Sequence, residues 1–95
     1  GAAGCISGLG NVAPLTLNTI HTAFVTGDLA AAEAAQTRFS TLRKDLYAFG
    51  FPPALVKRAL RHAAPEVGAS RAPVLIADDV DAKVKALSAT YAEAV

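Results

Sequence analysis

The chain has 95 residues and a formal net charge of +1, so it forms one small domain, and binding driven by a strong field of either sign is excluded. Hydrophobic residues make up 53% of the sequence, which excludes a disordered tail. Alanine accounts for 22 residues, and because alanine is the best helix former we predict closely packed helices around an aliphatic core.

The first ten residues differ from the rest of the chain because they are rich in glycine. We predict a short strand around Ile6 that ends in a glycine-rich turn. A single strand cannot satisfy its own hydrogen bonds, so it needs neighbours that the rest of the chain does not supply. Cys5 is the only cysteine, which excludes an internal disulfide and indicates a reducing, cytosolic setting.

Apolar residues at helical spacing predict helices through the remainder of the chain. These helices are expected near residues 11–26, 29–49, 53–64 and 79–94. Asn11 is expected to cap the first helix, Asp28 the second, and Asp78 or Asp79 the last. Gly27 is expected to stop the first helix. The second helix is the most clearly marked, because a narrow apolar stripe runs along it, formed by Ala32, Ala35, Phe39, Leu42, Leu46 and Phe49.

A basic cluster lies in the third predicted helix and consists of Lys57, Arg58, Arg61 and His62. A helix face with several cations could lie against phosphates. The rest of the chain balances this charge, however, and cations near the C-terminal end of a helix are favoured by its dipole. We therefore interpret the cluster as a solvated helix face and expect no nucleic-acid partner.

Few residues could carry metal or nucleophilic chemistry. His21 and His62 fall on different predicted helices with no carboxylate beside either, whereas a metal site needs three or four converging ligands. Cys5 is interpreted as a small buried thiol, and helix capping explains the acidic residues between positions 78 and 81. We expect no metal, no complete active site and no membrane span, because every apolar stretch is too short to cross a bilayer.

The stretch from Gly4 to Pro14 reads Gly-Cys-Ile-Ser-Gly-Leu-Gly-Asn-Val-Ala-Pro. It resembles the eighth-strand motif of the dihydrodipicolinate synthase / N-acetylneuraminate lyase family, in which a Gly-x-Ile-Ser turn leads to an Asn-Val-Ala helix start. The order of motifs further along the chain is similar as well: Gly27-Asp28, then Pro53, then Val56-Lys57, then Arg71-Ala72-Pro73. The resemblance covers nearly the whole chain.

Members of this family are (β/α)8 barrels with extra C-terminal helices. The resemblance implies that residues 1–26 are the last strand and helix of such a barrel and that residues 27–95 are the appended helical region. Seen alone, the chain would be mainly α, with a short strand before about four helices.

The family's reaction is aldol cleavage or condensation through a Schiff base between a barrel lysine and a pyruvate-type 2-oxo acid, and it implies no cofactor. The lysine lies on the sixth strand, and a tyrosine relays protons from another strand. Because these groups lie upstream in the family, the resemblance implies that Lys57 is not the Schiff-base lysine and that the chain alone is inactive.

One site position carries over from the family motif. Ile6 matches the isoleucine that lies beside bound pyruvate, and Ser7 and Gly8 are its neighbours at the same rim. Such barrels place their active sites at the C-terminal ends of their strands. Ile6 can supply an apolar wall and a backbone carbonyl, but it cannot act as an acid, a base or a nucleophile. Gly8 stands where sialic-acid lyases have a serine that contacts substrate, which argues against sialic acid.

The alternative is an autonomous helical module that self-associates and has no catalytic activity. The glycine-rich strand favours the enzyme part, because an independent helical bundle has no use for such a strand. Cut away from a barrel, the first helix would present Leu17, Ile20 and Phe24 to water. We therefore expect a homo-oligomer, with residues 1–24 exchanged between copies or packed at the interface.

Overall fold

The computed structural model describes residues 2–93, and every regular element within them is helical. The α-helices are α1 (Pro14–Val25), α2 (Leu29–Tyr47), α3 (Pro52–Ala63) and α4 (Asp78–Thr90), and two short 3-10 turns are η1 (Leu9–Asn11) and η2 (Pro65–Val67). The prediction of a mainly helical chain with four helices is confirmed. Ala94, where the last helix is predicted to end, lies outside the described residues. None of the helices in residues 2–93 is long and apolar enough to cross a membrane.

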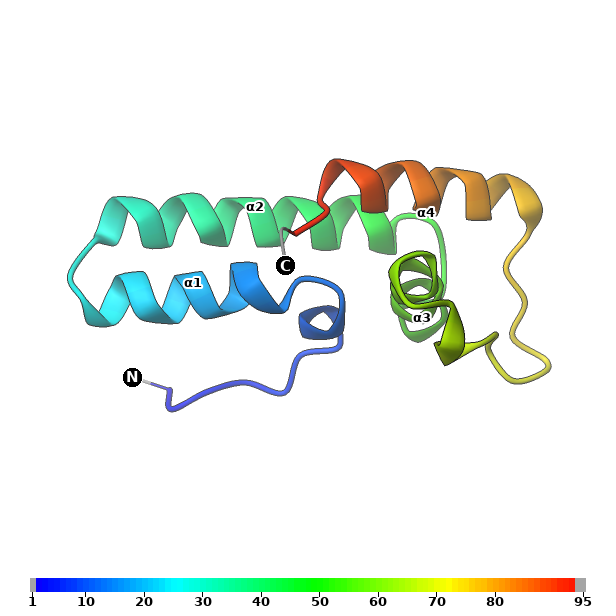
Figure 1. Ribbon diagram of the computed structural model, residues 1–95, viewed down its shortest axis with the longest axis horizontal. Helices are drawn as coiled ribbons and strands as arrows, with labels where there is room; N and C mark the ends of the chain where they lie inside the picture. The colour runs from blue at the N-terminus through cyan, green and yellow to red at the C-terminus, as the bar shows by residue number, and fades with distance from the viewer. Residues whose placement is uncertain (1, 94–95) are drawn as a thin grey trace.

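The strand predicted around Ile6 is wrong for the part of the chain that the structure describes. Residues 2–8 lead into η1 without entering a strand, and in Figure 1 this segment runs along the outside of the helices. The reason is that no described segment lies extended beside it to pair with its N–H and C=O groups. Ile6 is fully exposed as a result.

The first two helices form an antiparallel hairpin that sets the long dimension of the molecule, 44 Å against 24 Å in the other two directions. Gly27 ends α1 with a positive φ of 83°, a backbone conformation that glycine adopts at little cost. The Asp28 carboxylate then caps α2 by accepting a hydrogen bond from the Ala31 N–H at 3.1 Å. Both predictions for this turn are confirmed.

The hairpin changes what α1 presents to solvent. Leu17 and Ile20, which were expected to face water, pack against the core instead because α2 covers them. Phe24 remains 66% exposed. The expectation of three exposed side chains on this helix is therefore wrong for two of them.

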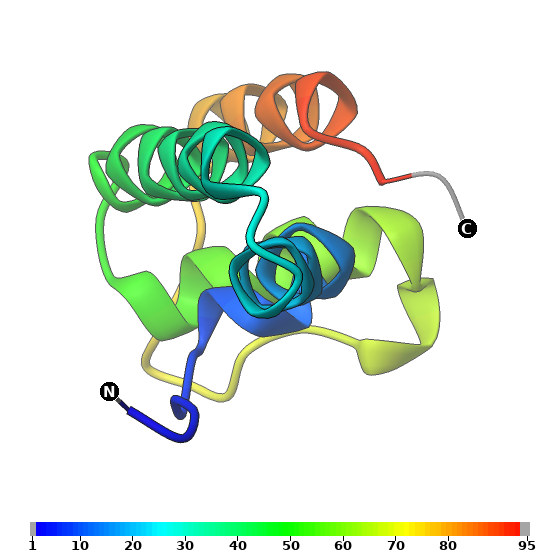
Figure 2. The same cartoon turned by 90° about the vertical axis from the view of Figure 1, so that its left-hand side faces the viewer.

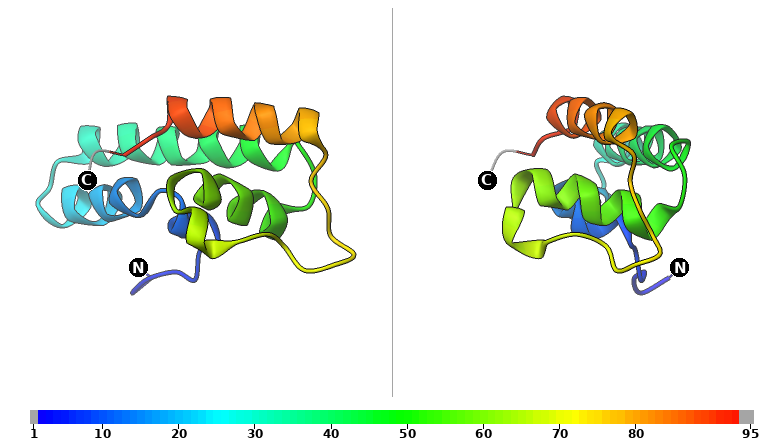
Figure 3. Two further views of the ribbon diagram at one scale, coloured as in Figure 1. Left: turned by 45° about the vertical axis from the view of Figure 1, so that its right-hand side comes forward. Right: turned by 90° about the vertical axis from the view of Figure 1, so that its right-hand side faces the viewer.

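The core lies where α3 and α4 meet the C-terminal half of α2. Figure 3 shows α4 running beside α2 while α3 lies below the pair, and η1 closes the remaining side. The core is aliphatic apart from one aromatic ring, as predicted. Its buried members are Leu9, Ala13, Phe39, Leu42, Leu46, Leu55, Val56, Ala59 and Val84.

Two of the predicted helix caps are wrong. Asn11 precedes α1 by three residues, and its Nδ2 donates to the Gly8 carbonyl at 2.9 Å, which holds η1 rather than the helix. The residue before α4 is Ala77, and no side chain among residues 2–93 caps that helix. Asp78 and Asp79 lie inside its first turn, where their charge still favours the positive end of the helix dipole.

The start of α1 is capped from the other end of the chain. The Glu93 carboxylate accepts hydrogen bonds from the backbone N–H of Leu15 at 2.9 Å and of Thr16 at 2.5 Å. It also accepts the Thr16 hydroxyl at 2.7 Å. Ala13, which immediately precedes the helix, has no side chain that could do this, so Glu93 satisfies N–H groups that would otherwise lack a partner. Figure 2 shows the C-terminal segment returning from α4 toward α1.

Candidate functional site

The three candidate residues, Ile6, Ser7 and Gly8, lie in one segment that passes beside Tyr47 of α2. The Ser7 hydroxyl accepts a hydrogen bond from the Gly10 N–H at 3.1 Å. A Cβ atom added at Gly8 would lie 3.8 Å from the Tyr47 hydroxyl, so the backbone passes close to that ring. Ser7 and Gly8 are thus held in place, whereas the Ile6 side chain is fully exposed.

One groove beside this segment has a volume of about 460 Å³, and we call it the Arg43 groove. The segment from Cys5 to Leu9 forms one wall, and the other wall comes from α1 and α2, with Gln36, Arg43 and Tyr47 as its polar members. The Arg43 guanidinium carbon lies 5.3 Å from the centre of the Tyr47 ring, which is a cation–π distance. The candidate residues therefore border a groove that contains one cation.

A second groove lies next to the first and has a volume of about 430 Å³. We call it the Lys57 groove. Gly8 and Tyr47 line both grooves, so the two share a border. The remaining wall of the Lys57 groove is formed by α3 and η2 and is mostly apolar.

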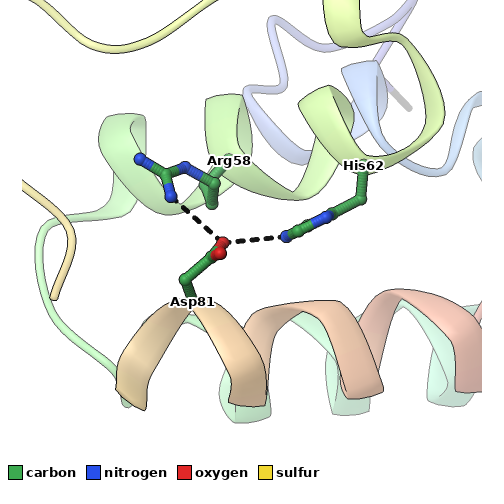
Figure 4. Close-up of polar contacts among 3 residues, drawn as sticks. All are labelled: Arg58, His62 and Asp81. Atoms are coloured by element: carbon green, nitrogen blue, oxygen red, sulfur yellow. Dashed lines mark hydrogen bonds and ion pairs between the residues drawn. The ribbon is translucent and has the colours of Figure 1, made fainter. Parts of the chain in front are cut away.

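The basic cluster on α3 divides between two grooves, because Arg58, Arg61 and His62 line one of them together with Asp81. Arg58 and His62 turn toward α4, where one carboxylate oxygen of Asp81 lies 3.1 Å from Arg58 Nη1 and 2.9 Å from His62 Nε2 (Figure 4). Lys57 lines a different groove. The interpretation as a solvated helix face is therefore wrong for Arg58, which α4 partly covers, whereas His62 is exposed.

Asp81 is the centre of this contact between α3 and α4. Burial raises the pKa of its carboxyl, but the hydrogen bonds and positive charges of Arg58 and His62 outweigh that effect, and the net pKa is lowered from its ordinary value. The carboxylate is thus held ionised. The expectation that neither histidine has a carboxylate nearby is wrong for His62, since Asp81 lies 19 residues further along the chain and reaches it only through the fold.

The remaining candidates for chemistry are isolated. Within residues 2–93, no three His, Cys, Asp or Glu side chains come together in a way that could hold a metal ion. His21 is exposed on α1. The Cys5 thiol is exposed as well, so its interpretation as a buried residue is wrong, for the same reason that the strand does not form.

Comparison with known proteins gives one match. The model of the family described as "Dihydrodipicolinate synthetase family" matches residues 1–90, which include the candidate segment and all four helices. No curated protein matches the chain, and no solved structure matches it.

Proposed function

Because the chain belongs to the dihydrodipicolinate synthetase family, we propose that it is the C-terminal part of a lyase of the aldolase type that acts on pyruvate-type 2-oxo acids through a lysine Schiff base. In this proposal residues 1–26 are the last strand and helix of a (β/α)8 barrel, and residues 27–95 are its appended helical region. The observation that carries the proposal is the family match over residues 1–90.

Ile6, Ser7 and Gly8 are the proposed substrate-binding residues. Ile6 would supply an apolar wall beside the methyl group of a bound 2-oxo acid, and its carbonyl could accept a hydrogen bond. Its full exposure leaves the side chain available for such a contact. In the complete barrel, neighbouring strands would pair with this segment and hold it extended, which the helices of this chain cannot do.

We further propose that none of the four lysines forms the Schiff base. A nucleophilic lysine must be partly deprotonated, which requires burial or a neighbouring cation. Lys44, Lys83 and Lys85 are exposed on their helices, and only Lys57 is partly buried. The nucleophile and the proton relay would come from other strands of the barrel.

A chimera tests the proposal: residues 1–95 replace the corresponding part of an active family member. Pyruvate followed by borohydride should trap an adduct on the chimera, checked by intact mass. Ile6→Asp should raise the KM for pyruvate at least about tenfold, because a carboxylate repels the carboxylate of the substrate. Cys5→Ser, at the neighbouring exposed position, should leave KM within about twofold.

The isolated chain provides the second arm of this experiment. Its mass should stay unchanged after the same treatment. A trapped adduct on Lys57 would overturn the assignment of the nucleophile, and an unchanged KM in a folded Ile6→Asp chimera would remove Ile6 from the substrate site.

A second candidate function is a helical self-association module without catalytic activity. It is favoured by the core that this chain closes by itself, where Leu46, Leu55 and Val84 are at most 1% exposed. It is also favoured by an open groove of about 520 Å³ at the α1–α2 turn, lined in part by Ile20, Phe24 and Leu29. In either function we propose a homo-oligomer, with Phe24 in the contact.

A further inference from the structure

Lys57 differs from Arg58 and His62 on the same helix because it has no acidic partner among residues 2–93. Arg61 forms no ion pair with these residues either, but it lines another groove, together with Arg58, His62 and Asp81. In the part of the chain that the structure describes, Arg58 and His62 share Asp81, and Glu93 is used by the start of α1. Lys57 forms no ion pair with residues 2–93, although it is partly buried. A lysine that borders an apolar groove and has no counter-ion among the described residues favours an anionic ligand.

The walls around Lys57 are apolar. Val56, Leu60 and Val67 line the groove together with the prolines that open α3. Those two prolines occupy the first turn of the helix and have no N–H groups, so the backbone there offers fewer donors to an anion than most helix starts do. The ammonium group of Lys57 is therefore the main anchor for a negative charge in this groove.

The other polar groups of the groove do not carry charge. The Asn11 amide already donates to the Gly8 carbonyl at 2.9 Å, and the Tyr47 hydroxyl lies beside Gly8. The volume of about 430 Å³ falls within the range of small-molecule sites, roughly 300–1,000 Å³. One cation at the edge of an apolar groove of this size complements a molecule with one carboxylate and an apolar body.

We propose that the Lys57 groove binds a monocarboxylate with an aliphatic or aromatic body. The carboxylate lies against the Lys57 ammonium group, and the body lies against Val56, Leu60 and Val67. Pyruvate has no body that would cover these walls, so this ligand differs from the substrate proposed for Ile6. The proposal does not depend on the aldolase reaction and concerns residues of this chain alone.

Titration of the 15N-labelled 95-residue chain with octanoate tests the site. Amide shifts should change at Val56, Lys57, Leu60 and Val67. Octanamide has the same body without the charge, and it should bind at least about tenfold more weakly, the size expected for one charge-assisted hydrogen bond.

Two variants complete the experiment. Lys57→Gln should weaken octanoate binding about tenfold and leave octanamide unchanged. Lys83→Gln is the matched control, because Lys83 is exposed on α4, and it should bind octanoate as the unmodified chain does.

Several results would overturn the proposal. One is equal affinity for octanoate and octanamide, a comparison that uses the unmodified chain and stands even if a variant unfolds. Others are unchanged octanoate binding by a folded Lys57→Gln variant, no binding at all, or shifts confined to the groove beside Phe24 and Leu29. A trapped pyruvate adduct is a separate outcome that concerns only the proposed function.

Discussion

The two halves of α2 have different surroundings, although apolar residues recur along the whole helix. In its C-terminal half, Leu42 and Leu46 are 3% and 1% exposed because α3, α4 and η1 cover them. At its N-terminal end, α1 is the only described element that lies alongside (Figure 1). Leu29 there remains 56% exposed. Within the apolar stripe, the number of covering elements decides how deeply a large side chain is buried.

The largest expected effect comes from a charge in the covered half. Leu42→Asp should unfold the domain, because an unpaired carboxylate would be buried in the core. Loss of the helical circular dichroism signal at 25 °C would show this. Leu29→Asp is the matched change at the open end and should remain folded. If both variants remain folded, the two halves of α2 do not differ in how deeply they bury their side chains.

A cavity in the covered half should lower the stability less than a buried charge does. Leu55→Ala should lower the free energy of unfolding by about 2–5 kcal/mol, because Leu55 is fully buried against the covered half. Phe24→Ala removes a larger side chain at the open end, and its cost should stay below about 1 kcal/mol. Urea unfolding of both variants gives the comparison, and a larger loss for Phe24→Ala would contradict it.

The open end should associate with a second copy. Burial of one large apolar side chain contributes about 1.5–3 kcal/mol, so we expect oligomers at tens of micromolar and a shift toward monomer for Phe24→Asp. Sedimentation velocity measures both. A monomeric unmodified chain at that concentration would show that the apolar residues of the open end tolerate water without a partner.

A smaller effect is expected where α4 joins the covered half. Asp81→Asn should destabilise the chain by about 1 kcal/mol at neutral pH, since the contact with Arg58 and His62 is partly exposed. Because the pKa of Asp81 is lowered in the folded chain from 3.8, its contribution is present above that pH and is lost as the pH falls further.

Thermal unfolding between pH 2 and pH 7 measures this contribution. The difference between the unmodified chain and Asp81→Asn should shrink below about pH 4. A difference that stays constant through that range would mean that the Asp81 charge contributes nothing.

The smallest effect is expected near the middle of α2. The Arg38 guanidinium carbon lies 4.9 Å from the centre of the Tyr91 ring, and the arginine is exposed. Arg38→Ala should cost about 0.5 kcal/mol, the size of an exposed cation–π contact. Urea unfolding measures the change in the free energy of unfolding. A loss above about 1.5 kcal/mol would contradict the prediction and would mean that Arg38 stabilises the packing where the two halves of α2 meet.

The helices could be predicted because their limits depend on local chemistry. Gly27 and Asp28 act within one turn of their own positions, so the sequence around them is sufficient. The burial of Ile20 could not be predicted by the same means, because Phe24 has the same helical spacing and remains exposed. Which of the two is covered depends on how α2 packs against α1.

The candidate site was predictable only as a motif. The Gly-Cys-Ile-Ser segment indicates the family without any knowledge of the structure, whereas its conformation depends on partners that four helices do not supply. The contact of His62 with Asp81 and the cap formed by Glu93 had no local signal, since each joins residues far apart in the sequence. Lys57 has a motif position, and Val56 and Leu60 of its own helix supply part of its apolar surroundings, but Val67 and Tyr47 come from other elements.

The contact of Glu93 with the start of α1 also has a consequence for the order of folding. It joins positions 78 residues apart, and a ribosome releases the N-terminal helices first. The hairpin of α1 and α2 can form while synthesis continues, but its first N–H groups stay uncapped until Glu93 has left the exit tunnel. Loss of the Glu93 carboxylate would consequently leave the N–H groups of Leu15 and Thr16 without this partner and fray the start of the first helix.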